Sequence, residues 1–151
     1  MDWNRWLYIL LILLGGMPPR FAVVASIQAQ TTTPARQADP DNAEQVVLGQ
    51  QVYASFCAGC HGGNLEGQPN WRQRLPLSNF PASPHDETGY TWHHADQWLF
   101  EIVKYGGQIP CPPRDRSAMP AYQEMLSDAA IWAVLAFIKS HWIAAIRAQQ
   151  E

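Results

Sequence analysis

Residues 57 to 61 read Cys57-Ala-Gly-Cys60-His61, and they combine two thiols and an imidazole at a spacing that suits covalent attachment of haem. Two thiols separated by two residues can each add across a haem vinyl group. The histidine that follows them is placed to ligate the iron. We therefore predict one haem c, bound covalently through Cys57 and Cys60, with His61 as an axial metal ligand.

The same residues allow three other interpretations. A zinc ribbon needs a second pair of cysteines, whereas the third cysteine of the chain, Cys111, stands alone. A redox-active CxxC pair is expected beside a βαβ pattern, and the flanks here look helical. A disulfide between Cys57 and Cys60 stays open, because spacing alone does not exclude it.

A second axial ligand would separate an electron carrier from a haem protein that binds small molecules at an open position. Met119 lies in the run Ser-Ala-Met-Pro-Ala-Tyr, a polar, proline-stiffened loop before the last predicted helix. Its thioether is a soft ligand that favours ferrous iron and raises the reduction potential. We predict Met119 as the second ligand, with Met125 next. The remaining candidates are histidines: His85, His93, His94 and His141.

The amino-terminal segment has the pattern of an export signal. Arg5 precedes an apolar run from Trp6 to Leu14. This run is too short to span a bilayer, which takes about 20 apolar residues. Small residues follow at Ala25 and Ala29. We predict a signal peptide over residues 1–29, with an uncleaved anchor as the alternative. The predicted location is the periplasm or the outer face of the cytoplasmic membrane, where haem of this kind is attached in bacteria.

Length and charge narrow the classes of partner. The chain has 151 residues, with 10 basic and 13 acidic side chains and a formal net charge of −3. Such a chain forms one domain by length. A mildly acidic protein is a poor candidate for binding nucleic acid, and electrostatic docking would favour a partner with a basic patch.

The element that must position the cysteines is a helix. Residues 30–41 are rich in Thr, Pro, Ala and Gln and are predicted to form a flexible linker before a domain over residues 42–148. Asp41 is placed to cap the first helix, with Glu44 three residues later. An apolar face then recurs at helical spacing and leads to Cys57: Leu48, Val52, Tyr53 and Phe56.

Two more helices are predicted after long loops. Asp96 is placed to cap a short helix that ends at Gly106 and Gly107. Ser127 opens the last helix, whose apolar stripe continues to about Arg147. No segment has a convincing strand pattern, so the sequence predicts an all-α domain.

Together these residues give the chain a resemblance to class I c-type cytochromes of the small exported bacterial kind. The resemblance rests on Cys57, Cys60 and His61, on Met119 followed by proline, and on the two terminal helices. In that family a glycine and an aromatic residue of the first helix pack against an aliphatic and an aromatic residue of the last. The matching positions are Gly49 and Tyr53, and Val134 and Phe137.

The resemblance implies three or more helices wrapped around a haem c, low-spin iron and one-electron transfer through an exposed haem edge. Two features depart from the simplest members of that family. The segment from Gly67 to His94 is longer than a minimal loop, and Cys111 has no counterpart in the family pattern.

The predicted function is one-electron transfer between redox partners in a respiratory or related chain, without catalysis. The partners would be a protein donor and a protein acceptor, either of which could be a membrane complex, and contact with the membrane itself would require a retained amino-terminal segment. Two alternatives stay open. One is a haem c subunit of a larger oxidoreductase, and the second is a gas-binding or peroxidase-like haem domain with an open iron position.

Overall fold

The computed structural model describes residues 37–75, 80–109 and 116–150. The predicted signal peptide, most of the predicted linker and Cys111 lie outside these residues. The contacts divide the chain into Met1–Thr31 and Thr32–Glu151, and every described residue belongs to the second unit. The predicted boundaries at residues 29 and 41 stay predictions. At the end of the predicted linker, Ala38 is buried and Gln37 accepts a hydrogen bond from the Gln45 side chain.

A continuous helical run carries the two cysteines. It consists of α1 (Ala43–Val52), a π-helical turn η2 (Tyr53–Cys57) and α2 (Ala58–His61). Its cap is Asn42, not Asp41 as predicted, because the Asn42 side chain accepts a hydrogen bond from the backbone N–H of Gln45 at 3.1 Å.

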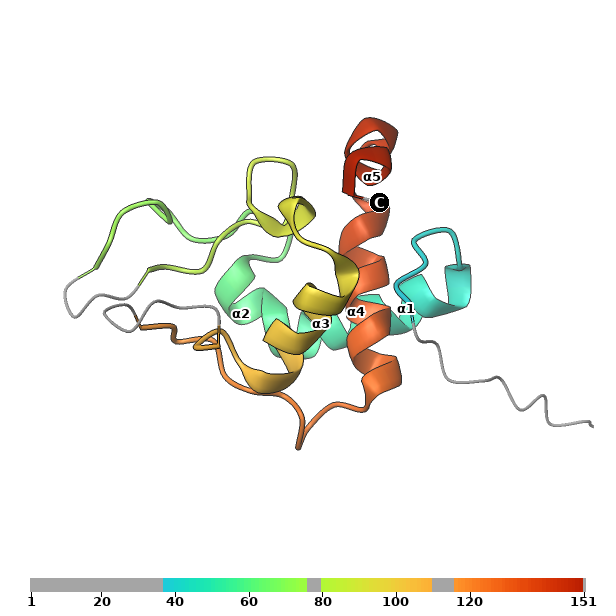
Figure 1. The fold of residues 1–151 in the computed structure, drawn as a ribbon, viewed down its shortest axis with the longest axis horizontal. Helices are drawn as coiled ribbons and strands as arrows, with labels where there is room; N and C mark the ends of the chain where they lie inside the picture. The colour runs from blue at the N-terminus through green and yellow to red at the C-terminus, as the bar shows by residue number, and fades with distance from the viewer. Residues whose placement is uncertain (1–36, 76–79, 110–115, 151) are drawn as a thin grey trace, which may run out of the picture. The chain divides into compact units, whose positions relative to one another are not determined.

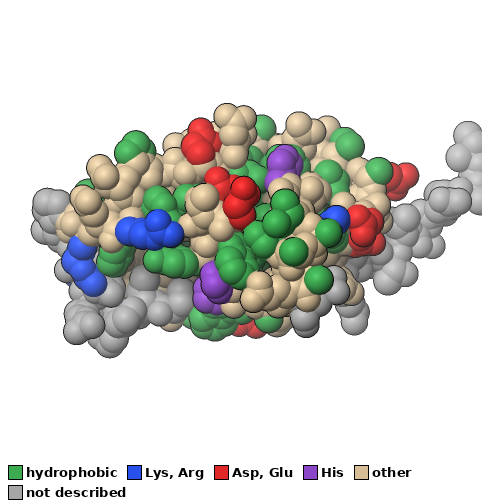
Figure 2. All heavy atoms as spheres, turned by 90° about the horizontal axis from the view of Figure 1, so that it is seen from above, with side chains coloured by type: hydrophobic (Ala, Val, Ile, Leu, Met, Phe, Trp, Pro, Cys, Tyr) green, Lys and Arg blue, Asp and Glu red, His purple; other side chains and the backbone are tan. Residues whose placement is uncertain are grey.

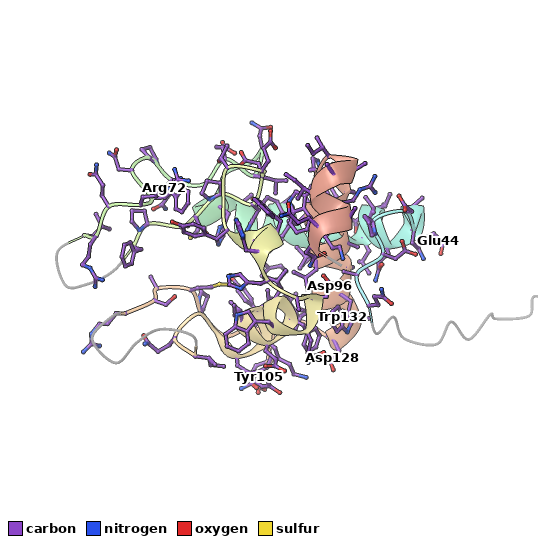
Figure 3. The ribbon with its side chains drawn as sticks, turned by 45° about the horizontal axis from the view of Figure 1, so that its top comes forward. Glu44, Arg72, Asp96, Tyr105, Asp128 and Trp132 are labelled. Carbon is purple, nitrogen blue, oxygen red and sulfur yellow. The ribbon has the colours of Figure 1, made fainter. Side chains whose placement is uncertain are left out.

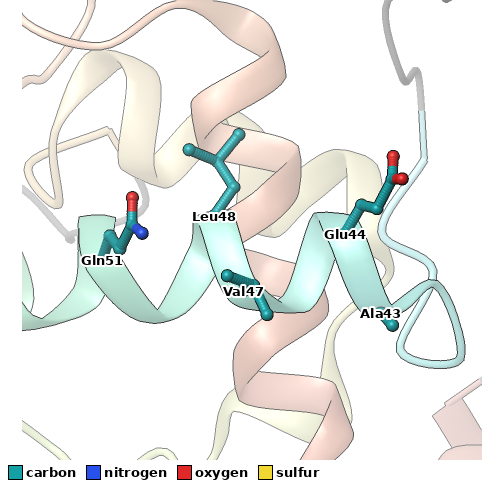
Figure 4. A pocket seen from close by; sticks show the side chains of 5 residues that line it. All are labelled: Ala43, Glu44, Val47, Leu48 and Gln51. Atoms are coloured by element: carbon teal, nitrogen blue, oxygen red, sulfur yellow. The ribbon is translucent and has the colours of Figure 1, made fainter.

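The buried face of this run differs from the predicted one. Val52 and Tyr53 are buried as expected, whereas Leu48 is 43% exposed and Phe56 is 40% exposed. Figure 4 shows Val47 and Leu48 in front of the α1 ribbon, with α4 behind it. The contact face is centred on Gly49, because the residue without a side chain allows the closest approach of the two helix backbones.

The sequence predicted a contact between the first and the last helix, and α1 does cross α4 (Asp128–Ser140) at close range. A Cβ atom added at Gly49 would overlap the carbonyl oxygen of Ala133 and lie 2.8 Å from Cβ of Phe137. The rings of Tyr53 and Phe137 pack with their centroids 5.3 Å apart. The predicted crossing is therefore present, and the atoms nearest to Gly49 belong to Ala133 and Phe137, while Val134 is buried in the core.

Helix α3 (Asp96–Tyr105) packs on α4 through stacked Phe100 and Trp132 rings, whose centroids are 4.4 Å apart. Figure 1 shows α3 in front of α4. The helix ends at Gly106, with φ 92°, as the sequence predicted. Asp96 is its first residue and does not cap it. The carboxylate instead accepts two hydrogen bonds from the Lys139 ammonium group, at 2.8 and 3.0 Å.

The last predicted helix is divided in two. Its start is confirmed, because Ser127 Oγ accepts a hydrogen bond from the N–H of Ala130. Helix α4 ends at Ser140, however, and α5 (Ala144–Gln150) follows a short turn. Trp142 in this turn is buried, and its indole N–H donates to the carbonyl of His85 at 2.7 Å. That contact with a distant loop favours the turn over a straight helix.

A single-turn 3-10 helix, η4 (Thr91–His93), completes the regular elements, and in the described ranges every regular element is helical. The fold is all-α, as predicted. Within the same ranges, no helix has both the length and the apolar character needed to cross a membrane. Figure 1 shows that the long loops after α2 and after α3 both extend away from α4 toward the same side of the picture.

Candidate haem site

The three residues of the predicted attachment motif lie at the end of the helical run. Cys57 is the last residue of η2, and Cys60 and His61 belong to α2, which ends at Gly62 with φ 82°. Cys57 is partly buried and Cys60 is exposed, and both thiols are free. A disulfide between them, which the sequence left open, is not formed. Both side chains are available for a covalent bond to another group.

The environment of the Cys57 thiol differs from that of a redox-active pair. Burial, with a smaller contribution from Cys60, raises the pKa of the Cys57 thiol to about 11. Redox-active CxxC pairs depend on the opposite shift, because the thiolate is their nucleophile. In the described part of the chain, no three His, Cys, Asp or Glu side chains form a metal-binding group.

The imidazole of His61 is held in the form that suits an iron ligand. Its Nδ1 atom lies 2.7 Å from the carbonyl oxygen of Ser83. A carbonyl can only accept, so Nδ1 carries the proton and the lone pair on Nε2 is left for a metal. Burial lowers the pKa of His61, although the hydrogen bond to Ser83 acts in the opposite direction. The neutral ring, oriented through Nδ1, fits haem ligation.

The loop after α2 brings Ser83 to His61 by a series of backbone hydrogen bonds. The N–H of Gly67 donates to the carbonyl of His61 at 2.7 Å, and that of Gln68 donates to Ala82 at 2.9 Å. Gly67 has φ 68°, and a Cβ atom there would lie 2.8 Å from Cδ of Pro84. The long loop after α2 therefore supplies the carbonyl that orients the predicted ligand.

Two arginine contacts brace the outer part of this loop. The guanidinium group of Arg72 lies over the Trp71 ring, 4.1 Å from its centroid, and donates to the carbonyl of Thr88. The guanidinium group of Arg74 lies 4.8 Å from the centroid of the Phe80 ring. Residues 67–85 contain no acidic side chain. Figure 3 shows Arg72 at the loop end of the domain and Glu44 on α1 at the other end.

The loop that contains Met119 follows α3. Met119 is partly buried, its N–H donates to Ser117 Oγ, and its carbonyl accepts from the N–H of Gly107, both at 3.2 Å. Tyr122, three residues later, donates its hydroxyl to the carbonyl of Phe56 at 2.9 Å. Phe56 directly precedes Cys57, so this loop lies against the helix that carries the cysteines.

The electrostatics of Tyr122 support the same placement. Burial raises the pKa of the Tyr122 phenol, and the nearby thiol groups of Cys57 and Cys60 add smaller contributions to this shift. The structure thus brings the loop of Met119 and the attachment motif together. Ligation of iron by the Met119 sulfur stays a prediction.

The remaining candidate ligands occupy positions that suit the role less well. Met125 is 55% exposed. The ring of His85 stacks face to face on that of His61, with centroids 4.0 Å apart. Two rings in direct contact cannot bind opposite faces of one haem. The ring of His93 stacks on that of Trp92, with centroids 3.7 Å apart. Nδ1 of His141 lies 2.9 Å from the carbonyl oxygen of Phe137.

Sequence reasoning missed three residues of the site. Ser83 acts through its carbonyl, which every residue has, so no side-chain pattern could reveal it. His85 was considered only as an axial ligand, whereas it supports the face of His61. Tyr122 ends the short run that begins at Ser117 and contains Met119, and its distance of three residues from that candidate ligand was the one available signal.

Comparison with known proteins bears on the whole domain. The family model for cytochrome c matches residues 46–142 of the chain. Among solved structures, cytochrome cL from the marine methylotrophic bacterium Methylophaga aminisulfidivorans MPT is similar, with 22% sequence identity and a TM-score of 0.47. The similarity covers 74% of this chain and 63% of that chain, which is less than two thirds of its length. No curated protein matches the sequence.

Proposed function

The chain belongs to the cytochrome c family, and from this premise we propose that it is a mono-haem electron carrier with His61 and Met119 as axial ligands. Family membership confirms the resemblance to class I c-type cytochromes, and the family is one of proteins that transfer electrons through covalently bound haem. Cys57 and Cys60 would hold the haem through thioether bonds. Haem iron supplies a centre that changes by one electron between its ferric and ferrous states.

The hydrogen bond between His61 and Ser83 is the observation that carries this proposal. It places the proton on Nδ1, orients the ring, and leaves the lone pair on Nε2, in a motif whose two thiols are free. A histidine ligand oriented through its second nitrogen is the usual arrangement at metal sites. The helical run supplies three groups in five residues, so a single element attaches the haem and ligates its iron.

Met119 is the proposed ligand on the opposite side. It comes from the loop that Tyr122 ties to the residue before Cys57, which brings that loop close to the attachment motif. A thioether ligand stabilises the ferrous state and raises the reduction potential. Two strong-field ligands leave no open position for a substrate, so the protein would carry electrons without catalysing a reaction.

The proposed partners are a redox protein that donates the electron and one that accepts it, and the proposed location is outside the cytoplasm. Residues 1–29 have the composition of an export signal. Figure 2 shows basic side chains at the left end of the visible face, and acidic ones in its middle and toward its right end, where a further basic side chain also lies. The net charge of the chain favours a partner with a basic patch, whereas Arg72 and Arg74 make the long loop locally positive. A partner that docks at this loop would therefore present acidic groups to it.

Absorption spectroscopy of the purified haem protein tests the proposal. The expected result is a sharp low-spin spectrum after reduction, unchanged by carbon monoxide, with the weak near-infrared band of sulfur bound to ferric iron. Met119→Ala should abolish this band and allow carbon monoxide to bind. Met125→Ala is the matched control and should leave both unchanged, because its side chain is largely exposed.

A high-spin spectrum, or rapid carbon monoxide binding by the unmutated protein, would contradict the proposal. It would favour the gas-binding or peroxidase-like alternative. A normal low-spin spectrum in a protein that is isolated only in a complex would instead favour the subunit of a larger oxidoreductase.

A further inference from the structure

The proposed proximal ligand is in contact with a second imidazole. The rings of His61 and His85 are stacked, with centroids 4.0 Å apart and an angle of 22° between their planes. These residues are distant in sequence, and His85 comes two residues after Ser83, the partner of His61 Nδ1. One short segment of the loop therefore contacts the ligand both in the plane of its ring and on its face.

His85 is itself held from several sides. Its N–H donates to the carbonyl of Leu65 at 2.8 Å, and its carbonyl accepts the indole N–H of Trp142 at 2.7 Å. Its Nδ1 atom shares a hydrogen bond of 2.7 Å with Thr91 Oγ1. Leu65, Trp142 and Thr91 are 2%, 3% and 6% exposed, respectively. The ring of His85 is thus a fixed surface and not a mobile side chain.

A fixed surface has a role here because one hydrogen bond does not orient a ring completely. The single contact from Nδ1 to Ser83 holds one edge of the His61 ring. The plane of the ring is also limited by its Cβ attachment and by whatever packs against the ring face. The stacked ring of His85 is a flat contact of that kind.

We propose that His85 is a positioning residue that sets the orientation of the His61 imidazole plane relative to the haem. The inference rests on the proposed function, since it requires His61 to ligate the iron. The orientation of an axial imidazole determines which iron d orbital its π system overlaps. It therefore controls how unpaired spin spreads over the haem edge in the ferric state.

The test compares two substitutions at this position in the full-length, haem-loaded protein. His85→Phe keeps a flat ring against His61, and His85→Leu removes it. The readouts are the proton NMR shifts of the haem methyl groups and the g values in electron paramagnetic resonance, both in the ferric state. We expect His85→Leu to change the order or spread of the methyl shifts and to move the g values. His85→Phe should move the shifts and g values less than His85→Leu does, because it keeps the flat contact and loses only the hydrogen bond to Thr91.

His141→Leu is the matched control, because it removes a histidine whose contacts are Phe137 and Ser140. Its methyl shifts and g values should equal those of the unmutated protein. A His85→Leu protein with unchanged shifts and g values would overturn the proposal. So would equal changes in the Phe and Leu variants, because these would reflect general packing and not the flat contact.

Thr91→Val provides a second test if His85→Leu does not load haem. It removes the hydrogen bond that anchors the His85 ring and should move the shifts in part, and unchanged shifts would contradict the proposal. The unmutated protein separates the two ideas. If it shows no low-spin spectrum with a histidine ligand, the proposed function fails, whereas a normal spectrum with no effect at His85 rejects the positioning role alone.

Discussion

The helix crossing and the loop side of this domain are held together in different ways. At the crossing, α1 and α4 meet backbone to backbone at Gly49 and Ala133, next to the packed rings of Tyr53 and Phe137. On the loop side, the residues proposed to bind haem are positioned by single backbone groups, such as the carbonyls of Ser83 and Phe56. One region depends on shape and the other on hydrogen bonds.

This difference shows that a small domain can use one region to stabilise the fold and another to position the residues of its proposed site. A packed helix pair excludes water and loses much free energy when its shape is changed. A loop that is fixed by a few backbone hydrogen bonds can accept many side chains while it keeps one carbonyl in place. Tyr53 joins the two regions, since its ring packs in the crossing and its hydroxyl donates to Gly62 in the loop.

The largest effect is expected at the proposed haem site, from removal of the two attachment cysteines at the end of the helical run. In Cys57→Ala/Cys60→Ala, no haem should remain on the chain after denaturation, because both thioether bonds are lost. The measurement is haem staining of a denaturing gel, with a pyridine haemochrome assay. Cys111→Ala is the control and should retain its haem. Covalent haem in the double variant would show that another residue attaches it.

The next largest effect is expected where α3 meets α4. Lys139→Met leaves the Asp96 carboxylate without its ammonium partner, in a pair whose side chains are 5% and 19% exposed. We expect a loss of about 3 kcal/mol in the free energy of unfolding, measured in urea, because the buried carboxylate loses its opposite charge and keeps only the hydrogen bond from Gln150. Lys104→Met breaks the exposed pair with Asp128 and should change stability little. Equal losses in both variants would contradict the role of burial.

A smaller effect is expected at the centre of the helix crossing. Gly49→Ala adds a Cβ atom that overlaps the Ala133 carbonyl and should cost about 2 kcal/mol of unfolding free energy. Gly59→Ala, in the same helical run, is the matched control, since a Cβ atom there meets nothing within 4 Å. Higher helix propensity should make that variant neutral or slightly more stable. If both variants behave alike in urea unfolding, the close approach at Gly49 is not what limits this position.

The smallest effect concerns Tyr53, the link between the two regions. Tyr53→Phe removes the hydrogen bond to Gly62 and should cost about 1 kcal/mol at neutral pH. Burial, with smaller contributions from Cys57 and Glu66, raises the pKa of Tyr53 above its usual value of 10.0. Above pH 10 the unfolded chain loses a proton that the folded chain keeps, so the free energy of unfolding falls as pH rises.

Urea unfolding between pH 7 and pH 11 measures this dependence. The decline above pH 10 should be shallower in Tyr53→Phe, because phenylalanine has no proton to release. A decline equal to that of the unmutated protein would mean that other groups cause the alkaline loss of stability.

Local patterns predicted much of the fold. Spacing alone indicated the CxxCH motif, the Ser127 cap and the end of α3 at Gly106, because each depends on residues that are close in sequence. The predicted caps at Asp41 and Asp96 were wrong. The competing partners were a neighbouring asparagine in the first case and a distant lysine in the second.

Contacts between distant segments decided what local patterns could not. The apolar period of α1 placed Leu48 in the core, but the close approach at Gly49 turned the contact face away from it. The last helix was predicted to continue to about Arg147, but Trp142 is held by the carbonyl of His85, and α4 ends at Ser140.

The sequence by itself determined the chemistry of this protein, namely two thiols and an imidazole in five residues, on a helix of an all-α domain. Only the tertiary structure decided how that chemistry is oriented. The carbonyl of Ser83 and the ring of His85 reach His61 from a loop more than twenty residues away. The physical reason is that a motif specifies side chains, whereas a backbone carbonyl is common to every residue and acquires its role only from where the chain places it.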